Sequence, residues 1–172
     1  MVVEKFVRMD DSAKGLKEVT ALVTSAGAQD AGKIMATNAQ GKMDDTLLPA
    51  GVGPEVQTAV ATEALAANDV VNIYDDTGTL SCRKADASDG TKKAHGFVKA
   101  AVDQGANATV YTDGFLAGVG LTKGSLYFLS ETAGLITSTP PTTAGAIVQA
   151  IGAAVSATAI KFDPDHLVIE RA

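Results

Sequence analysis

The amino-acid sequence predicts an all-β protein, with a small β-barrel or β-sandwich in its C-terminal domain and an extended N-terminal arm that contains a β-hairpin. Of the 172 residues, 46% are hydrophobic but only 5% are aromatic, and 17 are glycine. Long stretches of Val, Thr, Ala and Ser with frequent glycine favour β-strands joined by tight turns. A chain of this length buries one substantial core, so we expect one globular domain with an extension.

A turn pattern that recurs four times predicts four β-hairpins. In each case, alternating apolar residues are followed by an acidic residue or Asn, then small residues, a glycine, and apolar residues again. Asp and Asn hydrogen-bond to their own backbone in turns, and glycine accepts the positive φ that a tight hairpin requires. The four segments begin at Phe6, Ile34, Val71 and Tyr127.

The segment from residue 24 to residue 58 has the composition of an arm or linker. Its apolar residues are separated by small and polar ones, and Pro49 and Pro54 flank a Gly-Val-Gly sequence. Such a segment buries too little apolar surface to offset the entropy of ordering it. We therefore assign residues 1–58 to an N-terminal hairpin and extended docking arm, and residues 59–172 to the β-domain.

A short helix is expected at residues 53–65, because Glu55 follows Pro54 in what would be the first helical turn. Closely spaced strands separated by turn residues follow, which is typical of a barrel or sandwich. Residues 144–159 are rich in alanine, but their two glycines and their β-branched residues favour a strand over a helix. The expected strands cover residues 70–74, 79–84, 95–102, 109–112, 125–130, 135–139, 147–154, 159–162 and 167–171.

The formal net charge is −6, from 14 Lys and Arg against 20 Asp and Glu, and no basic run stands out. Direct binding to nucleic acid or to an anionic membrane is therefore not expected. A single cysteine, Cys82, excludes an intramolecular disulfide and a cysteine-rich zinc site, and we expect a half-buried strand residue. The charged N-terminus does not resemble a signal peptide, and no stretch approaches the roughly 20 apolar residues of a membrane helix, so synthesis in the cytoplasm is expected.

The residues that a hydrolase would need are sparse. His95 and His166 are the only histidines, and we expect structural roles for both. No serine lies in a Gly-x-Ser-x-Gly elbow. Residues 114–120 are glycine-rich but lack the Lys-Ser or Lys-Thr of a phosphate-binding loop, so we expect a flexible β-loop there. We expect no catalytic residue and no enzymatic activity.

Three acidic pairs, at residues 10–11, 44–45 and 75–76, are the candidates for a metal site. Each pair lies at or before a turn, where Asp is favoured for backbone hydrogen bonding alone. The surrounding sequences do not alternate oxygen ligands and end in a bidentate Glu, as a calcium loop does. The sequence predicts no metal site and no cofactor.

The apolar residues of the arm are the first candidates for a docking element. Too sparse to fold alone, they gain stability by lying on a partner, where each buried Leu contributes roughly 1.5 to 3 kcal/mol. The expected protein-interface residues are Lys33, Ile34, Met35, Met43, Leu47, Leu48, Pro49 and Val52.

Two segments carry more specific motifs. Residues 31–53 combine a Gly-Lys-apolar turn, an Asn/Gly turn and an Asp-Asp-x-Leu-Leu-Pro sequence, and residues 121–162 contain a Leu-Thr-x-Gly-x-x-Tyr-Phe-Leu-Ser motif followed by Val-Gln-x-x-Gly-x-Ala. In these features the chain resembles structural proteins of tailed bacteriophages, namely head decoration, head fibre and tail fibre proteins. The residues of the second segment that fill the motifs are Leu121, Thr122, Gly124, Tyr127, Phe128, Leu129, Ser130, Val148, Gln149, Gly152 and Ala154.

The resemblance covers about residues 31–53 and 65–162 and implies a β-domain, often trimeric, that is displayed on a capsid or forms part of a fibre. Because the chain lacks a long repetitive shaft, we expect a capsid decoration, or cement, protein that binds the major capsid protein on the exterior of the virion. The alternative is a short head-fibre or tail-fibre component that binds the host surface. A virion-borne cell-wall hydrolase is a third alternative, but the sequence shows no acidic cleft for it. The few charges in residues 145–159 suit burial against a symmetric neighbour and predict a homotrimer.

Overall fold

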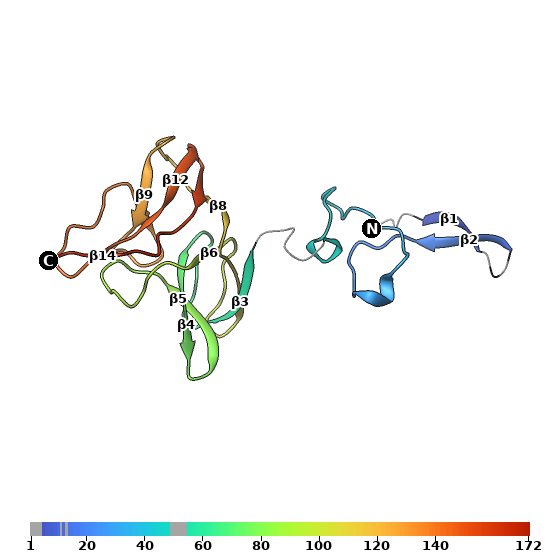
Figure 1. Cartoon of the computed structure of the whole chain (residues 1–172), viewed down its shortest axis with the longest axis horizontal. Helices are drawn as coiled ribbons and strands as arrows, with labels where there is room; N and C mark the ends of the chain where they lie inside the picture. Colours follow the sequence, from blue (N-terminus) through green and yellow to red (C-terminus); the bar gives the residue numbers. More distant parts are fainter. Residues whose placement is uncertain (1–4, 11, 13, 49–54) are drawn as a thin grey trace. The chain divides into compact units, whose positions relative to one another are not determined.

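The computed structural model describes residues 5–10, 12, 14–48 and 55–172, and its contacts divide the chain into two compact units. Residues 1–53 form the first, called here the N-terminal unit, and residues 54–172 form the second, called the C-terminal module. Strands dominate, and the only helices in the described part are two 3-10 helices of one turn each (Figure 1). The prediction of an all-β fold is confirmed.

The N-terminal unit is built on an antiparallel hairpin whose strands, β1 (Lys5–Asp10) and β2 (Gly15–Thr20), pair along their whole length. After the hairpin the chain runs through turns and the two 3-10 helices, η1 (Ala28–Asp30) and η2 (Asp45–Leu47). One isolated parallel bridge, between Leu22 and Met35, joins this irregular segment to the end of β2. In it the Leu22 N–H donates to the Ile34 carbonyl and the Ala36 N–H donates to the Leu22 carbonyl, each over 2.8 Å.

The C-terminal module contains a closed five-stranded barrel in the order β3-β5-β4-β6-β7. The barrel closes because β3 pairs in parallel with β5 on one side and antiparallel with β7 on the other. Its strands are β3 (Val56–Ala61), β4 (Val70–Asp76), β5 (Thr79–Lys84), β6 (Gly96–Val98) and β7 (Asn107–Tyr111). Residue 58, the predicted end of the arm, lies inside β3, so the first barrel strand begins before the predicted domain boundary.

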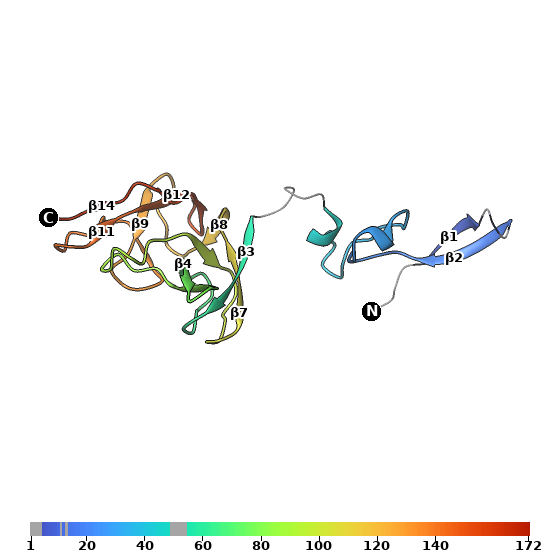
Figure 2. The same ribbon diagram turned by 60° about the horizontal axis from the view of Figure 1, so that its bottom comes forward.

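A second sheet, in the order β10-β9-β12-β13-β8, lies beside the barrel within the same module (Figure 2). A two-stranded ribbon of β11 and β14 accompanies it. The strands are β8 (Gly114–Ala117), β9 (Leu126–Leu129), β10 (Ile136–Thr137), β11 (Ile147–Val148), β12 (Ala150–Ser156), β13 (Ala159–Phe162) and β14 (Ile169–Glu170).

Two clusters of buried apolar side chains stabilise the module, one inside the barrel and one between the barrel and the second sheet. The barrel interior contains Val71, Val98 and the fully buried Cys82, and burial raises the pKa of the Cys82 thiol. The other cluster joins barrel residues such as Val70 and Phe97 to residues of the second sheet. Neighbouring residues of β4 and of β6 therefore enter different clusters, as alternation along a strand requires. The ring centroids of Phe97, in the barrel, and Phe162, in the second sheet, lie 5.0 Å apart, so the two rings pack against each other between the sheets.

Three of the four predicted hairpins are confirmed, as β1–β2, β4–β5 and β9–β10. In β4–β5, Thr77 and Gly78 both have positive φ, 51° and 91°, as a two-residue hairpin turn needs. The hairpin predicted at Ile34 is wrong. Asn38 does close a turn there, but Met35 pairs with Leu22 instead of with the far side of that turn.

The helix expected at residues 53–65 is also wrong, because Val56–Ala61 forms strand β3. Ala59 and Ala61 are buried in the barrel interior, and small side chains fit that narrow space. Hydrogen bonding to β5 and β7 outweighs the helical preference of the local sequence.

The loop expected at residues 114–120 begins with strand β8, whose Leu116 is 1% exposed and part of the core. The alanine-rich stretch at residues 144–159 forms strands β11 and β12, as predicted. The predicted bounds of β5 and β13 agree with the structure, whereas β6 is shorter than the predicted strand at residues 95–102.

Gly152 marks an irregularity in β12 that the fold depends on. Its φ is 143°, and the register between β12 and β9 shifts at this point. A Cβ atom at this position would lie 1.9 Å from the Lys161 carbonyl oxygen of β13, so only glycine fits.

We therefore expect Gly152→Ala to lower the free energy of unfolding of the C-terminal module by about 2 kcal/mol or more, through backbone strain and the clash with β13. Gly90→Ala is the matched control, because its Cβ would meet only the Ile147 Cγ2 atom at an ordinary 3.6 Å. Urea denaturation of both variants measures the difference. Equal midpoints for the two variants would contradict this account of the β12 irregularity.

Candidate functional site

The N-terminal unit has almost no core of its own. Among residues 5–10, 12, 14–44 and 46–48, Ala21 alone is buried, with 5% of its surface exposed. Hydrogen bonds between side chains and nearby backbone hold the irregular segment instead. The Ser25 N–H donates to the Thr46 hydroxyl over 2.9 Å, and the Asn38 side-chain oxygen accepts from the N–H groups of Gln40 and Lys42. These contacts order turns but bury little apolar surface.

One face of the β1–β2 hairpin presents its apolar side chains to solvent. Met9 and Leu16 are directly opposite each other in the register, with 63% and 76% of their surfaces exposed. Val7 lies on the same face, two residues before Met9, and is 64% exposed. A lone two-stranded hairpin is marginally stable in water, so this apolar face, Val7, Met9 and Leu16, is a candidate docking surface.

The predicted interface residues fall into three groups. Ile34, Met35 and Met43 are 40%, 54% and 44% exposed, and Lys33 is exposed as well. Leu47 and Leu48 are half-buried at η2. Pro49 and Val52 lie outside the described residues.

The structure brings Lys33 and Ile34 together with the hairpin. They line a groove of about 460 Å³ whose other walls come from β1, β2 and the Leu22 bridge. Met35, Met43, Leu47 and Leu48 are not among the residues that line it. The groove residues are Arg8, Val19, Thr20, Leu22, Ala31, Gly32, Lys33 and Ile34.

Local polar contacts fix the position of Lys33. Its ammonium group donates to the Asp30 carboxylate over 2.6 Å, and that carboxylate also accepts from the Ala26 N–H over 2.7 Å. The hydrogen bond from Lys33, together with that from Ala26, lowers the pKa of Asp30. The charge of Lys33 is therefore already compensated within the unit.

Sequence reasoning missed the hairpin as a docking surface. Val7 and Met9 alternate along β1, and Leu16 lies opposite Met9, so this face of a solvent-exposed hairpin carries three apolar side chains that nothing in the local sequence covers.

The C-terminal module has a polar pocket of about 360 Å³ that contains both histidines. His95 Nδ1 lies 3.1 Å from the Ile73 N–H nitrogen and 3.0 Å from the Ile73 carbonyl oxygen. The backbone of Ile73 is therefore the hydrogen-bond partner of this ring nitrogen. Partial burial lowers the pKa of His95, and the charges of Lys93 and His166 lower it further, while the hydrogen bond to Ile73 acts in the opposite direction. The carboxylates around the pocket belong to Glu55, Asp163 and Asp165.

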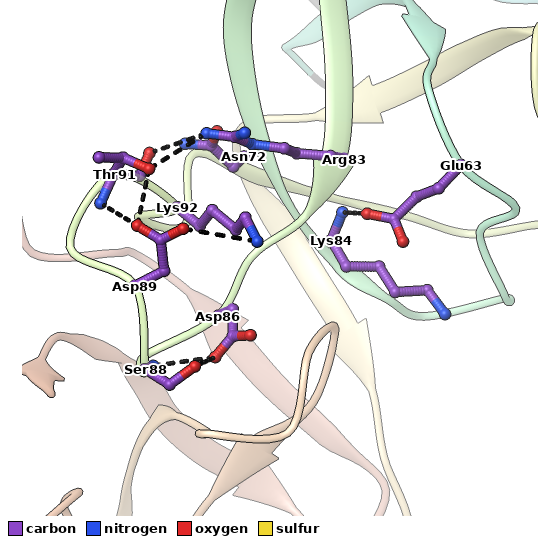
Figure 3. A network of polar contacts seen from close by, with 9 residues as sticks. All are labelled: Glu63, Asn72, Arg83, Lys84, Asp86, Ser88, Asp89, Thr91 and Lys92. Carbon is purple, nitrogen blue, oxygen red and sulfur yellow. Dashed lines mark hydrogen bonds and ion pairs between the residues drawn. The ribbon is translucent and has the colours of Figure 1, made fainter. Parts of the chain in front are cut away.

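The loop between β5 and β6 uses its carboxylates to shape turns (Figure 3). Asp86 accepts from the N–H and hydroxyl of Ser88, and Asp89 accepts in the same way from Thr91. Arg83 of β5 holds this loop by donating to the Thr91 carbonyl over 3.3 Å, and it also donates to the Asn72 side-chain oxygen of β4 over 3.1 Å.

Acidic residues elsewhere behave alike, since Asp10, Asp44 and Asp75 accept hydrogen bonds from residues two or three positions further along the chain. The predicted turn role of the acidic pairs is confirmed at these residues. Within the described part of the chain, no three His, Cys, Asp or Glu side chains are grouped so that they could hold a metal ion.

Comparison of the chain with protein-family models, with curated proteins and with solved structures finds no significant match. The described residues contain no helix that is both long and apolar enough to cross a membrane. Function therefore has to be inferred from the chain's own residues and geometry.

The lowered pKa of His95 predicts a pH dependence. The folded chain favours the neutral ring, whereas the unfolded chain takes up a proton near the ordinary pKa of 6.5. Stability is therefore fully present above pH 6.5 and falls as the pH drops below it toward the folded-state pKa. The loss should stay below about 1 kcal/mol, because the ring is partly exposed to solvent.

Thermal unfolding between pH 8 and pH 5 measures this effect. We expect His95→Gln to flatten the decline, and His166→Gln, the control, to retain most of it. The lowered pKa values of Asp30, Asp44, Asp89 and Asp113 keep these carboxylates out of this pH window. An unchanged slope in His95→Gln would disprove the assignment.

Proposed function

We propose that this chain is a capsid decoration, or cement, protein of a bacteriophage. Its N-terminal unit docks on the major capsid protein at the exterior of the head, the C-terminal module is displayed from there, and the chain catalyses no reaction. The observation that carries the proposal is the exposure of apolar side chains in a unit that buries Ala21 alone among its described residues. The resemblance of the motifs in residues 31–53 and 121–162 to those of phage head and fibre proteins supports the choice of partner.

The proposed mechanism is a gain of interface on the assembled shell. Each aliphatic side chain of the hairpin face that becomes buried contributes roughly 1.5 to 3 kcal/mol. A protein that binds the assembled capsid but not its separated subunits shifts the equilibrium toward assembly by mass action. Decorated heads should therefore withstand more heat before they release their DNA.

Replacing the hairpin face tests the docking step. We expect the triple variant Val7→Ser, Met9→Ser, Leu16→Ser to bind heads stripped of this protein at least about a hundredfold more weakly than the wild type. The melting temperature of the C-terminal module should not change. Val119→Ser is the matched control, because Val119 is 89% exposed on the C-terminal module.

Binding to stripped heads is measured by co-sedimentation over a range of protein concentrations, followed by the temperature of DNA release. Equal binding by the wild type and the triple variant would refute docking through the hairpin face. Labelled protein that binds host cells but not stripped heads would refute the decoration function and favour a fibre component.

We further propose that the chain forms a homotrimer through the outer face of the second sheet. A row of paired residues, Phe115, Lys161, Ala153 and Leu126, crosses β8, β13, β12 and β9 on this face. Phe115 and Leu126 are 60% and 47% exposed. Lys161 is ion-paired with Asp113, so its charge would not repel a neighbouring copy.

Val155, 44% exposed on β12, allows a test of the trimer. We expect light scattering to give three times the 17.4 kDa chain mass for the wild type, and Val155→Glu to shift it toward the monomer because a buried, unpaired carboxylate is costly. Val119→Glu is the control for the added charge. A wild-type mass of 17.4 kDa both in solution and after release from heads would contradict the trimer.

A further inference from the structure

The hairpin has a second face, and its charges are arranged unfavourably for the free chain. On this face, Arg8 of β1 is directly opposite Lys17 of β2 in the register. Like charges at directly opposite positions destabilise an antiparallel pair. Lys17 reaches the Asp10 carboxylate only at 3.9 Å, and within the part of the chain that the structure describes, Arg8 makes no hydrogen bond or ion pair.

Arg8 also lines the groove between the hairpin and residues 31–34. The charge of the other cation in the groove, Lys33, is compensated by Asp30 at 2.6 Å. Beside the Arg8 guanidinium lie apolar side chains, the half-buried Val19 and the 40% exposed Ile34. Within the described part of the chain, the groove therefore combines an apolar wall with one positive charge that has no ion-pair partner.

We propose that this groove binds an extended peptide segment of the partner in which a carboxylate side chain lies beside an aliphatic one. A guanidinium group binds a carboxylate through two parallel N–H···O hydrogen bonds, a geometry that an ammonium group does not offer. The aliphatic neighbour covers Val19 and Ile34. The capsid protein as the source of the segment rests on the function proposed above, whereas the chemistry of the segment rests on the groove alone.

The charge arrangement makes it possible to distinguish a role of Arg8 in ligand binding from a role in stabilising the hairpin. A residue that stabilises the free hairpin should cost stability when it is replaced. Arg8 faces Lys17 and has no hydrogen-bond or ion-pair partner among the described residues, so Arg8→Gln should leave the free chain as stable as the wild type or more stable. The same substitution should weaken binding of the acidic segment.

Two short peptides probe the groove, acetyl-Ser-Leu-Asp-Leu-Ser-amide and its Asn counterpart. Each is titrated into the isotope-labelled full chain and followed by proton–nitrogen NMR. We expect the Asp peptide to shift the signals of Val19, Gly32 and Ile34, and to bind about two- to fivefold more tightly than the Asn peptide, as one exposed charge pair allows. Arg8→Gln should bind both peptides equally, whereas Lys14→Gln, which removes one positive charge at the hairpin turn, should behave as the wild type.

The groove assignment is overturned if the wild type does not discriminate between the peptides, or if Arg8→Gln still discriminates. It is equally overturned if the signals that shift lie only in the C-terminal module. Co-sedimentation with stripped heads separates this outcome from the decoration function. If the wild type prefers the Asp peptide but does not bind heads, the groove assignment holds and the capsid protein is not its partner. If the wild type and Arg8→Gln bind heads equally well, the groove does not contribute to docking on the head.

Discussion

A chain segment keeps one conformation only if the apolar surface it buries offsets the conformational entropy that it loses, and the two units of this protein meet this constraint differently. The C-terminal module does so internally, with Val70, Phe97 and Phe162 packed between a closed barrel and a second sheet. The N-terminal unit does not, since its described residues bury Ala21 and otherwise rely on exposed hydrogen bonds. The proposed division of labour, a self-sufficient module and a docking unit, follows from this difference.

Several polar side chains of the C-terminal module stabilise its local structure. Asp86 and Asp89 accept hydrogen bonds that shape turns in the loop between β5 and β6, and the His95 ring contacts the Ile73 backbone. Exposed apolar side chains, in contrast, have no role in the isolated chain. Burial against a partner would give Val7, Met9 and Leu16 such a role, and a carboxylate from that partner would relieve the repulsion between Arg8 and Lys17.

Local signals in the sequence predicted the parts of the fold that depend on neighbouring residues. The turn at Thr77 and Gly78 is encoded by its own residues. Strand β3 was missed because its burial depends on pairing with β5 and β7, which lie far along the chain. The groove was missed for the same reason, since the Leu22–Met35 bridge that holds Ile34 beside the hairpin has no local signature. Lys33 and Ile34 were nevertheless predicted as interface residues, because their segment is too polar to fold alone.

Hydrogen exchange of the free and the head-bound protein tests the central claim most directly, because it reports the stability of each unit separately. The account predicts that amides of β1, β2 and the Leu22 bridge exchange rapidly in the free chain and become strongly protected on the head. Amides of the barrel should be protected in both states. Strong protection of β1 and β2 in the free monomeric chain, or a gain of protection confined to the C-terminal module on binding, would contradict it.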